Sequence, residues 1–318
     1  MIEVKNLTKA FGRKKAVDGI TFEVGKGQVL GFLGPNGAGK STTMRMVTGF
    51  FPPTSGTISI AGIDMLADPI AAKTRIGYLP ENAPLYTDMT VSGFLGFMAE
   101  MRGLRGSLKR KAVDRVLDMC FLNRVRHQSI DTLSKGYRHR TCFAQSILHD
   151  PDILILDEPT DGLDPNQKHE VRSLIKRMGE KKAIIFSTHI LEEVEAACSR
   201  AVIIDRGKIV ADGSPDELKA KAANAGHLAV RVDGGSAAEV RAALEGIDGV
   251  KSVVPATAEA AANGRFAATV VPADRGKSTA VAASIGSLCV TRKWTLTGLQ
   301  ELEGRLDDVF RSITQSDT

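Results

Sequence analysis

The sequence lacks any apolar run close to the roughly 20 residues that a helix needs to span a bilayer. Its first residues, MIEVKNLTKAFGRKK, contain no apolar core of the kind found in signal peptides. We therefore expect a chain that is neither secreted nor inserted into a membrane. The four cysteines are scattered, without a CxxC pair or a metal-ligand spacing. They are interpreted as small buried residues in a reducing compartment.

Basic clusters, internal repeats and low-complexity segments are also absent. The net charge of +5 comes from Lys and Arg residues spread along the chain, which favours solubility over nucleic-acid binding. The 318 residues include 43% hydrophobic and 25% charged residues, a balance typical of a globular protein. This length allows one large domain and a smaller one.

Residues 1–220 alternate short β-branched runs with amphipathic helical patterns and glycine-rich turns, which predicts an α/β domain. The uniformly apolar runs at 29–33, 153–156 and 183–186 are typical of parallel strands covered on both faces. The stretch from about 85 to 150 is mostly helical in pattern and is predicted to be a helical subdomain.

Residues 221–226 are rich in alanine and glycine and are interpreted as a linker. Beyond them, residues 227–318 show the order strand, helix, strand, strand, helix, strand, which predicts a small ferredoxin-like α/β domain. The second of these helices is expected to begin at Lys277, and the last strand is expected within LCVTRKWTL, residues 288–296.

A phosphate-binding motif follows the first apolar run. It fits G-x-x-x-x-G-K-[ST] and consists of Gly34, Pro35, Asn36, Gly37, Ala38, Gly39, Lys40 and Ser41. Glycines allow backbone N–H groups to turn inward around phosphates, and the next helix directs its N-terminal dipole at the same anion. Lys40 supplies a positive charge for the β- and γ-phosphates, and the Ser41 hydroxyl is a ligand for Mg²⁺.

Two carboxylates, Asp157 and Glu158, come directly after the apolar run ILIL. The carboxyl end of a parallel strand lies at the same sheet edge as the phosphate loop, so Asp157 can hold Mg²⁺ while Glu158 activates water. Alone, such a pair is more often a solvated turn, but the phosphate loop reverses that preference. His189, after another apolar strand, could reach the γ-phosphate, although a lone histidine is more often structural.

Four motifs occur together in one order: GPNGAGKST (34–42), LSKGYRHR (133–140), ILILDEPTDGLDP (153–165) and STH (187–189). With them, residues 2 to about 218 resemble the nucleotide-binding subunits of ATP-binding-cassette (ABC) transporters. The LS-x-G motif is diagnostic, because other phosphate-loop families lack it. The resemblance implies an ATPase that uses ATP and Mg²⁺.

The resemblance also implies roles for individual residues. Phe11 would stack on adenine, and Thr42 would contact the nucleotide at the phosphate loop. Ser134 and Gly136 would contact the γ-phosphate of ATP held by a facing subunit, and Asp164 would link the two sites across the dimer. His189 would contact the γ-phosphate.

Three positions depart from the family's usual pattern. Glu81 stands where a glutamine is usual, and its carboxylate could approach Mg²⁺ while adding negative charge beside the γ-phosphate. The signature carries Lys135 and Tyr137 where LSGGQ is commonest, and Phe11 stands where tyrosine is frequent. None of these changes removes a catalytic group.

The resemblance further implies partners and a location. The segments IGYLPEN-PLY and GRLDDVF (304–310) are similar to those of export-type cassettes that pair with type 2 ABC permeases. We expect a second copy or a related ABC subunit, an integral-membrane permease and no nucleic acid. The chain would lie in the cytoplasm, on the inner face of the cell membrane.

Two other functions are weighed against this one. A soluble cassette ATPase acting on ribosomes or DNA usually carries two cassettes or a long coiled coil between its motifs, whereas this chain has one cassette. A phosphate-loop kinase would leave LSKGY and His189 without a purpose. The transported substrate cannot be predicted, because substrate contacts belong to the permease.

Overall fold

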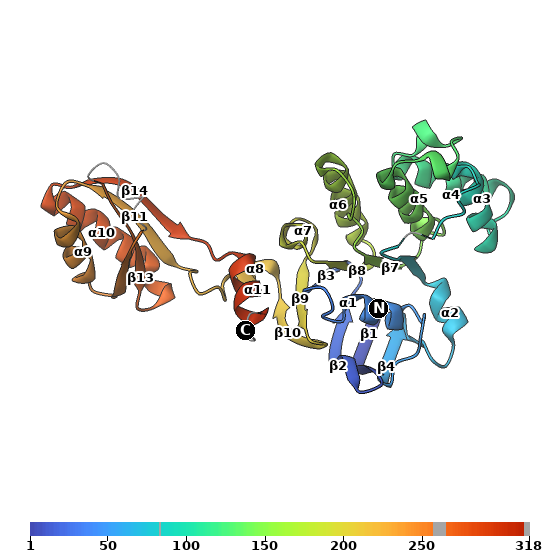
Figure 1. Cartoon of the computed structure of the whole chain (residues 1–318), viewed down its shortest axis with the longest axis horizontal. Helices are drawn as coiled ribbons and strands as arrows, with labels where there is room; N and C mark the ends of the chain where they lie inside the picture. The colour runs from blue at the N-terminus through green and yellow to red at the C-terminus, as the bar shows by residue number, and fades with distance from the viewer. Residues whose placement is uncertain (83, 257–264, 315–318) are drawn as a thin grey trace. The chain divides into compact units, whose positions relative to one another are not determined.

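The computed structural model describes residues 1–82, 84–256 and 265–314. The chain divides into two compact units, Met1–Pro215 and Asp216–Thr318 (Figure 1). This division lies ahead of the alanine- and glycine-rich stretch that the sequence analysis interprets as a linker. In the second unit Ala222 and Ala225 of that stretch are buried.

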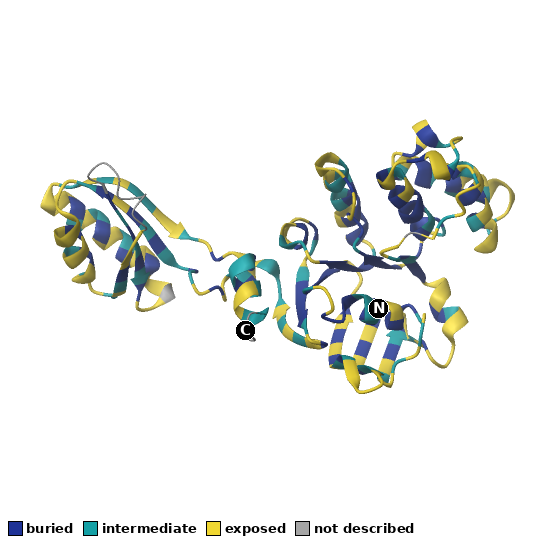
Figure 2. Ribbon diagram, in the orientation of Figure 1, coloured by how far each residue is buried: buried dark blue, intermediate teal, exposed yellow. Residues whose placement is uncertain are grey.

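A six-stranded sheet forms the centre of the first unit, in the order β10-β9-β3-β8-β7-β6. All neighbours in this sheet are parallel except β10, which runs antiparallel to β9. Every residue of β3, β7 and β8 is buried, which confirms the prediction from their apolar sequences (Figure 2). The strands are β3 (Val29–Leu33), β6 (Ile76–Leu79), β7 (Ile153–Asp157), β8 (Ala183–Thr188), β9 (Arg200–Asp205) and β10 (Lys208–Gly213).

An antiparallel sheet of four strands, in the order β2-β1-β4-β5, completes the strands of the first unit. One apolar core joins it to the parallel sheet, with Ile2, Phe22, Phe32, Met44 and Ile155 among its buried members. The core therefore holds the loop after β3 between two sheets. The strands are β1 (Ile2–Phe11), β2 (Lys14–Val24), β4 (Ser55–Ile60) and β5 (Ile63–Asp64).

The predicted helical subdomain contains three helices that share a second apolar core, with Phe94, Leu117 and Phe143 at its centre. The second of these helices begins at Gly106, with Arg105 as its N-cap. The helices of the first unit are α1 (Lys40–Val47), α2 (Pro69–Thr74), α3 (Val91–Met101), α4 (Gly106–Met119), η1 (Asn123–Val125), η2 (Ile130–Thr132), α5 (Lys135–Ile147), α6 (Pro165–Gly179) and α7 (Leu191–Ala197).

The second unit contains a four-stranded antiparallel sheet in the order β12-β13-β11-β14. With one helix after β11 and another after β13, this is the arrangement of a ferredoxin-like fold, as predicted. Its core is apolar and includes Val230, Val240, Val270 and Ile285. The elements are β11 (His227–Asp233), α9 (Ala237–Glu245), β12 (Val250–Pro255), β13 (Arg265–Pro272), η4 (Arg275–Lys277), α10 (Ser278–Arg292), β14 (Thr295–Leu302) and α11 (Leu306–Thr314), with α8 (Pro215–Lys219) at the start of the unit.

The predicted start of the last strand is wrong, because residues 288–290 belong to the end of α10. Val281, Ile285 and Cys289 recur every four residues and are all buried, which is the spacing of one helix face. The helix ends where Lys293 takes a left-handed conformation with φ 58°, and β14 begins two residues later. A short apolar run cannot be assigned to a strand or a helix without its wider periodicity.

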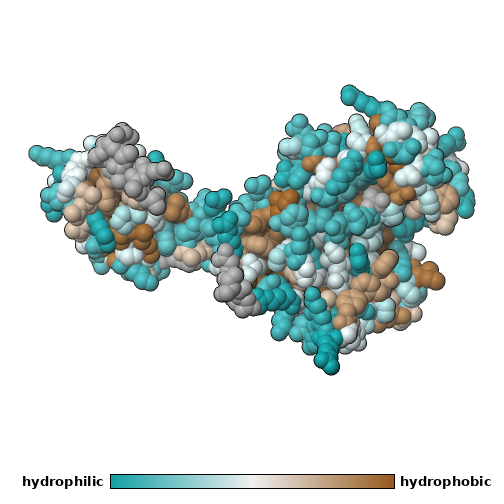
Figure 3. Space-filling view, in the orientation of Figure 1, coloured by the Kyte–Doolittle hydropathy of each residue, from teal (hydrophilic) through white to brown (hydrophobic). Residues whose placement is uncertain are grey.

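Among the described residues, no helix combines the length and the apolar character needed to cross a membrane. The face of the chain drawn in Figure 3 is mostly hydrophilic, with apolar residues in small groups. Such groups are usual on the surface of a globular protein.

Candidate functional site

The phosphate loop joins β3 to α1, and two of its glycines, Gly34 and Gly39, are required by close contacts with the backbone. A Cβ on Gly34 would lie 2.4 Å from the carbonyl oxygen of Ile204, and a Cβ on Gly39 would lie 2.6 Å from that of Ala16. Gly39 also has a φ of 111° and gives α1 no side-chain cap. The N-terminus of α1 therefore depends on other groups, such as a phosphate, to accept hydrogen bonds from its first N–H groups.

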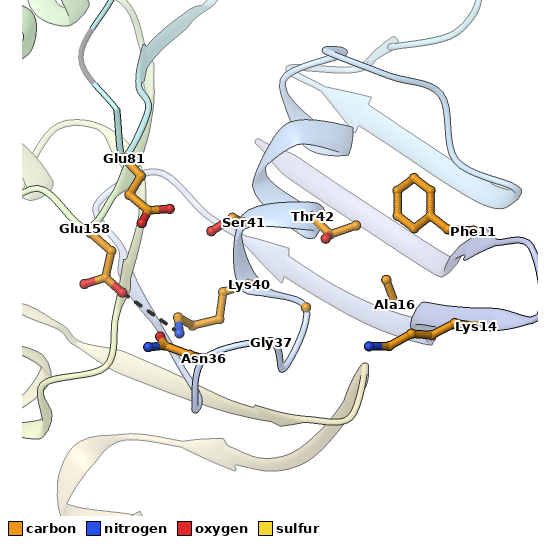
Figure 4. Close-up of a pocket in the computed structure, with 11 residues that line it drawn as sticks. Phe11, Lys14, Ala16, Asn36, Gly37, Lys40, Ser41, Thr42, Glu81 and Glu158 are labelled. Atoms are coloured by element: carbon orange, nitrogen blue, oxygen red, sulfur yellow. Dashed lines mark ion pairs between the residues drawn. The ribbon is translucent and has the colours of Figure 1, made fainter.

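A cavity of about 440 Å³ opens at this loop. Phe11 lies at one end of it and Glu158 and Glu81 at the other, with Lys40 between them (Figure 4). The Phe11 ring is 54% exposed, so a planar group can stack on it. The cavity thus offers an aromatic face at one end and a phosphate-binding loop with acidic groups beyond it.

Lys40 is buried and lies between backbone carbonyls and a carboxylate. Its Nζ donates to the carbonyl oxygen of Gly34 at 2.7 Å and lies 3.9 Å from Oε1 of Glu158. Burial lowers the pKa of Lys40, while the negative charges of Glu158, Asp157 and Glu81 act in the opposite direction. These carboxylates therefore help to keep the buried ammonium charged.

Glu158 combines a buried carboxylate with an unusual backbone. Burial raises its pKa, and a hydrogen bond from Nδ1 of His189 to Oε2, at 3.0 Å, opposes that rise. Its φ is 52°, a left-handed value that costs a non-glycine residue of order 1–3 kcal/mol and that occurs often at functional sites. The Glu158 N–H donates to the carbonyl oxygen and the hydroxyl of Ser187. This backbone holds the carboxylate at the end of β7, facing the cavity.

Asp157 offers an oxygen that could bind a cation. The residue is 1% exposed, and its Oδ1 accepts from the hydroxyls of Ser41, at 3.3 Å, and Ser187. Its Oδ2 is buried and has no hydrogen-bond partner in the described part of the chain. A buried carboxylate oxygen without a donor is unfavourable unless a cation neutralises it. Asp157 and Ser41 therefore fit the oxygen ligands of Mg²⁺.

The structure does not bring Ser134, Gly136 or Asp164 to this cavity. Ser134 and Asp164 are the N-caps of α5 and α6, where their side chains accept from backbone N–H groups. Asp164 as cap and Pro165 as first helical residue set the start of α6. Gly136 is buried beside the Gln167 side chain. None of these three residues lines the cavity at the phosphate loop.

The unusual signature lysine has a partner within the chain. Lys135 Nζ forms a 2.9 Å ion pair with Asp161, and both side chains are at least half exposed. Gly162 lies under the Lys135 side chain, where a Cβ would come within 2.5 Å of it. The lysine is therefore accommodated by the segment that follows Glu158, although an exposed pair adds little stability.

Sequence reasoning missed several residues around the cavity. Lys14 and Ala16 line it from β2, and no motif marks them. Ser187 belongs to the STH motif but was given no role, although its hydroxyl contacts both Asp157 and the Glu158 backbone. Ser187 pairs with Asp157 of the neighbouring strand near the end of β8, and this position is what indicates a role at the site.

The fold and the site together define a phosphate-loop ATPase of the α/β class. A family profile described as ABC transporter matches residues 17–161. Over 220 residues the chain is 38% identical to the linearmycin resistance ATP-binding protein LnrL of Bacillus subtilis (strain 168), covering 69% of this chain and 70% of LnrL. The chain therefore belongs to the family of ABC transporter ATP-binding proteins, and it is an ATP-binding ATPase subunit.

Two further relatives extend the comparison. The probable multidrug ABC transporter ATP-binding protein YbhF of Escherichia coli (strain K12) is 40% identical over 225 residues, or 70% of this chain, and the chain spans 39% of the length of YbhF. The dimeric post-hydrolysis structure of the ATP-binding cassette MJ0796, bound to ADP and Pi, has a similar fold. Its TM-score is 0.63 at 23% identity, over 67% of this chain and 98% of that chain.

Proposed function

We propose that this ATPase subunit powers export through a separate integral-membrane permease and hydrolyses ATP between two facing copies. The observation that carries the proposal is the separation of the motifs. Phe11, Lys40, Ser41 and Glu158 line one cavity, whereas the signature residue Ser134 lies outside it. A second subunit is the simplest source of the missing contacts.

In the proposed half-site each described group has one task. Phe11 stacks on the adenine, and the phosphate loop with Lys40 neutralises the phosphates. Ser41 and Asp157 hold Mg²⁺, with Glu81 in reach of the same cavity, and the ion neutralises charge on the phosphates when it is bound. Glu158 accepts the proton of the attacking water, since it lies beside Lys40 with a raised pKa that suits a base.

His189 is proposed to act on the same step. Its Nδ1 donates to Glu158, and when the ring carries both protons Nε2 of this half-exposed ring can donate to a γ-phosphate oxygen. The hydrogen bond also orients the Glu158 carboxylate. His189 would thus form hydrogen bonds both to the base, Glu158, and to the γ-phosphate.

The second half-site is proposed to be Ser134, Gly136 and Asp164 of a facing copy. Ser134 and Gly136 lie at the N-terminus of α5, a 13-residue helix whose dipole favours an anion. The dimeric state of the MJ0796 cassette supports an arrangement of two cassettes. ATP would then join the two subunits and be hydrolysed only between them.

An exposed apolar surface supports a permease partner. Ile70 on α2 is 79% exposed and Met101 on α3 is 69% exposed. The ends of these helices are adjacent, because Arg102 donates to the carbonyl oxygen of Lys73. Tyr86 packs against Phe97 of α3 at 5.7 Å. Exposed apolar side chains on adjacent helices favour a protein interface, which we assign to a permease of the type 2 ABC class.

The relatives support export and a membrane location. LnrL is a resistance protein and YbhF a probable multidrug transporter subunit, so we propose an export role at the inner face of the cell membrane. We also propose residues 1–220 as the ATPase domain and 227–318 as an appendage that stabilises the dimer. The transporter relatives do not favour a role on ribosomes or DNA.

The substitution Glu158→Gln tests the proposed site. It removes the base but keeps the shape, so ATP hydrolysis should fall by about 100-fold or more while ATP binding persists. The variant should accumulate as an ATP-bound dimer in light scattering, and Glu180→Gln serves as an exposed control. Hydrolysis at the wild-type rate would show that Glu158 is not the base. A monomer that hydrolyses ATP at full rate would contradict the shared site.

A further inference from the structure

Glu193 is a buried carboxylate that none of the motifs includes. It lies on α7 and is only 1% exposed. A carboxylate this deep is tolerated only when other groups donate hydrogen bonds to it or neutralise it. The groups that contact it therefore indicate what it holds in place.

Two threonine hydroxyls and one ammonium surround the Glu193 carboxylate. Thr160 Oγ1 donates to Oε1, and Thr188 Oγ1 donates to Oε2 at 2.8 Å. Nζ of Lys168 lies 3.8 Å from Oε1. Each oxygen of the carboxylate thus has its own threonine, and both threonines are themselves buried.

These threonines belong to the two segments that carry the reacting groups. Thr160 comes two residues after Glu158, and Thr188 directly precedes His189. The paired residues of β7 and β8 end at Asp157 and Ser187, and the Glu158 N–H then donates to the Ser187 carbonyl oxygen. Beyond that pair the separation of the two segments must be set by other contacts.

Glu158 needs such contacts more than most residues. Its left-handed backbone persists only where the surroundings hold it. The Glu193 carboxylate ties the segment after Glu158 to the segment before His189. Glu158 and His189, which are 3.0 Å apart, each lie within two residues of one of these threonines.

We infer that Glu193 is a positioning residue for ATP hydrolysis, which fixes Glu158 and His189 against each other without touching the nucleotide. The inference rests on the roles proposed above for these two residues. A small misplacement of a reacting group lowers the rate of the chemical step far more than it lowers the affinity for the substrate. Glu193 should therefore control kcat and leave the affinity for ATP unchanged.

The substitution Glu193→Gln tests this in the full chain. The amide can accept one threonine proton, but its nitrogen only donates, and Thr188 Oγ1 already accepts from the Ile190 N–H. We expect kcat to fall about tenfold, with KM and the dissociation constant for a fluorescent ATP analogue within about twofold. Glu192→Gln, an exposed neighbour on the same helix with the same change of charge, should keep the wild-type kcat.

A second pair of variants keeps the test informative if Glu193→Gln does not fold. Thr188→Val removes only the hydroxyl and should lower kcat, whereas Thr188→Ser keeps the hydroxyl and should restore it. In the Glu158→Gln background, Glu193→Gln should have little further effect, because both changes act on one step. A wild-type kcat in Glu193→Gln or in Thr188→Val overturns the inference. So does an equal loss in the Glu158→Gln background. An active Glu158→Gln variant would instead refute the proposed base, which is a separate result.

Discussion

The two units of this chain treat buried charge in opposite ways. All buried ionisable side chains of the described residues other than cysteine lie in the first unit: Lys40, His139, Arg140, Asp157 and Glu193. The second unit buries apolar side chains, with Ser278 as its buried polar residue in the described ranges. Burying a charge costs free energy, whereas burying an apolar side chain is favourable. The buried charges therefore lower the stability of the first unit, and the buried apolar side chains stabilise the second.

This difference separates a chemical site from a structural core. In the first unit Asp157 lies at the carboxyl end of β7 and Lys40 at the phosphate loop, where they can act on a nucleotide, whereas His139 and Arg140 lie on α5 and Glu193 on α7. In the second unit the apolar residues of β11 and α10 only pack against one another. Substitutions of the charged residues at the site should therefore change activity, and substitutions in the apolar core of the second unit should change stability.

The largest effect on ATP binding is expected from Lys40→Met. The change removes the buried charge next to the phosphates and leaves Glu158 without its ion pair, so ATP affinity should fall by about 10- to 100-fold. Equilibrium binding of a fluorescent ATP analogue measures this. Lys26→Met, an exposed lysine, should bind ATP like the wild type. Unchanged affinity in Lys40→Met would break the comparison at its strongest point.

The second unit should respond to Ile285→Ala with a loss of stability. Ile285 is fully buried in its apolar core, and the cavity should lower the free energy of unfolding by about 2–4 kcal/mol. Denaturant titration followed by Trp294 fluorescence reports on this unit, because Trp294 is the single tryptophan. Val290→Ala, at a residue that is 79% exposed, should change it little. We expect ATPase activity to stay within about twofold of wild type, and a collapse of activity would contradict the comparison.

His149 should make the first unit sensitive to acid. Burial lowers its pKa to about 4, while its Nε2 contacts the carbonyl oxygen of Ile76 at 3.1 Å. Between pH 6.5 and 4 the unfolded chain then binds a proton that the folded chain does not, so stability falls as pH falls.

The measurement is thermal or urea unfolding at pH 7 and pH 5. Relative to His149→Gln, the wild type should lose an additional stability of about 1–2 kcal/mol on going from pH 7 to pH 5. His127→Gln, at an exposed histidine, should behave like the wild type. An equal pH dependence in wild type and His149→Gln would show that this ring does not carry the effect.

The smallest effect expected is a displaced pH profile in His189→Ala. Burial raises the pKa of Glu158, and the His189 hydrogen bond lowers it. Hydrolysis needs ionised Glu158, so the acid limb of the ATPase profile should lie above the ordinary carboxyl pKa. It should move to still higher pH when His189 is removed. Residual kcat/KM measured from pH 5 to 8 shows this, with His169→Ala as an exposed control. A limb that moves to lower pH would contradict the assigned contact.

Much of the fold could be predicted because its signals are local. The apolar runs of β3, β7 and β8 are long enough to identify buried parallel strands, and the Asp164-Pro165 pair identifies the start of α6. The end of α10 could not be predicted as well, because Leu288–Val290 fits a strand when read alone. Within this segment only Cys289 is buried, and it continues the four-residue spacing of Val281 and Ile285 in α10.

The sequence by itself determined the phosphate loop, the paired Asp157 and Glu158, and the family to which they belong. These depend on the order of residues in short segments, which the chain carries before it folds. Only the tertiary structure showed that Asp157 Oδ2 is buried without a donor, that Glu158 has a left-handed backbone, and that the Glu193 carboxylate joins Thr160 to Thr188. The reason is physical: the hydrogen bonds from Glu158 to Ser187 and from Thr160 to Glu193 join residues 29 and 33 apart in sequence, so they exist only after β7, β8 and α7 have packed together.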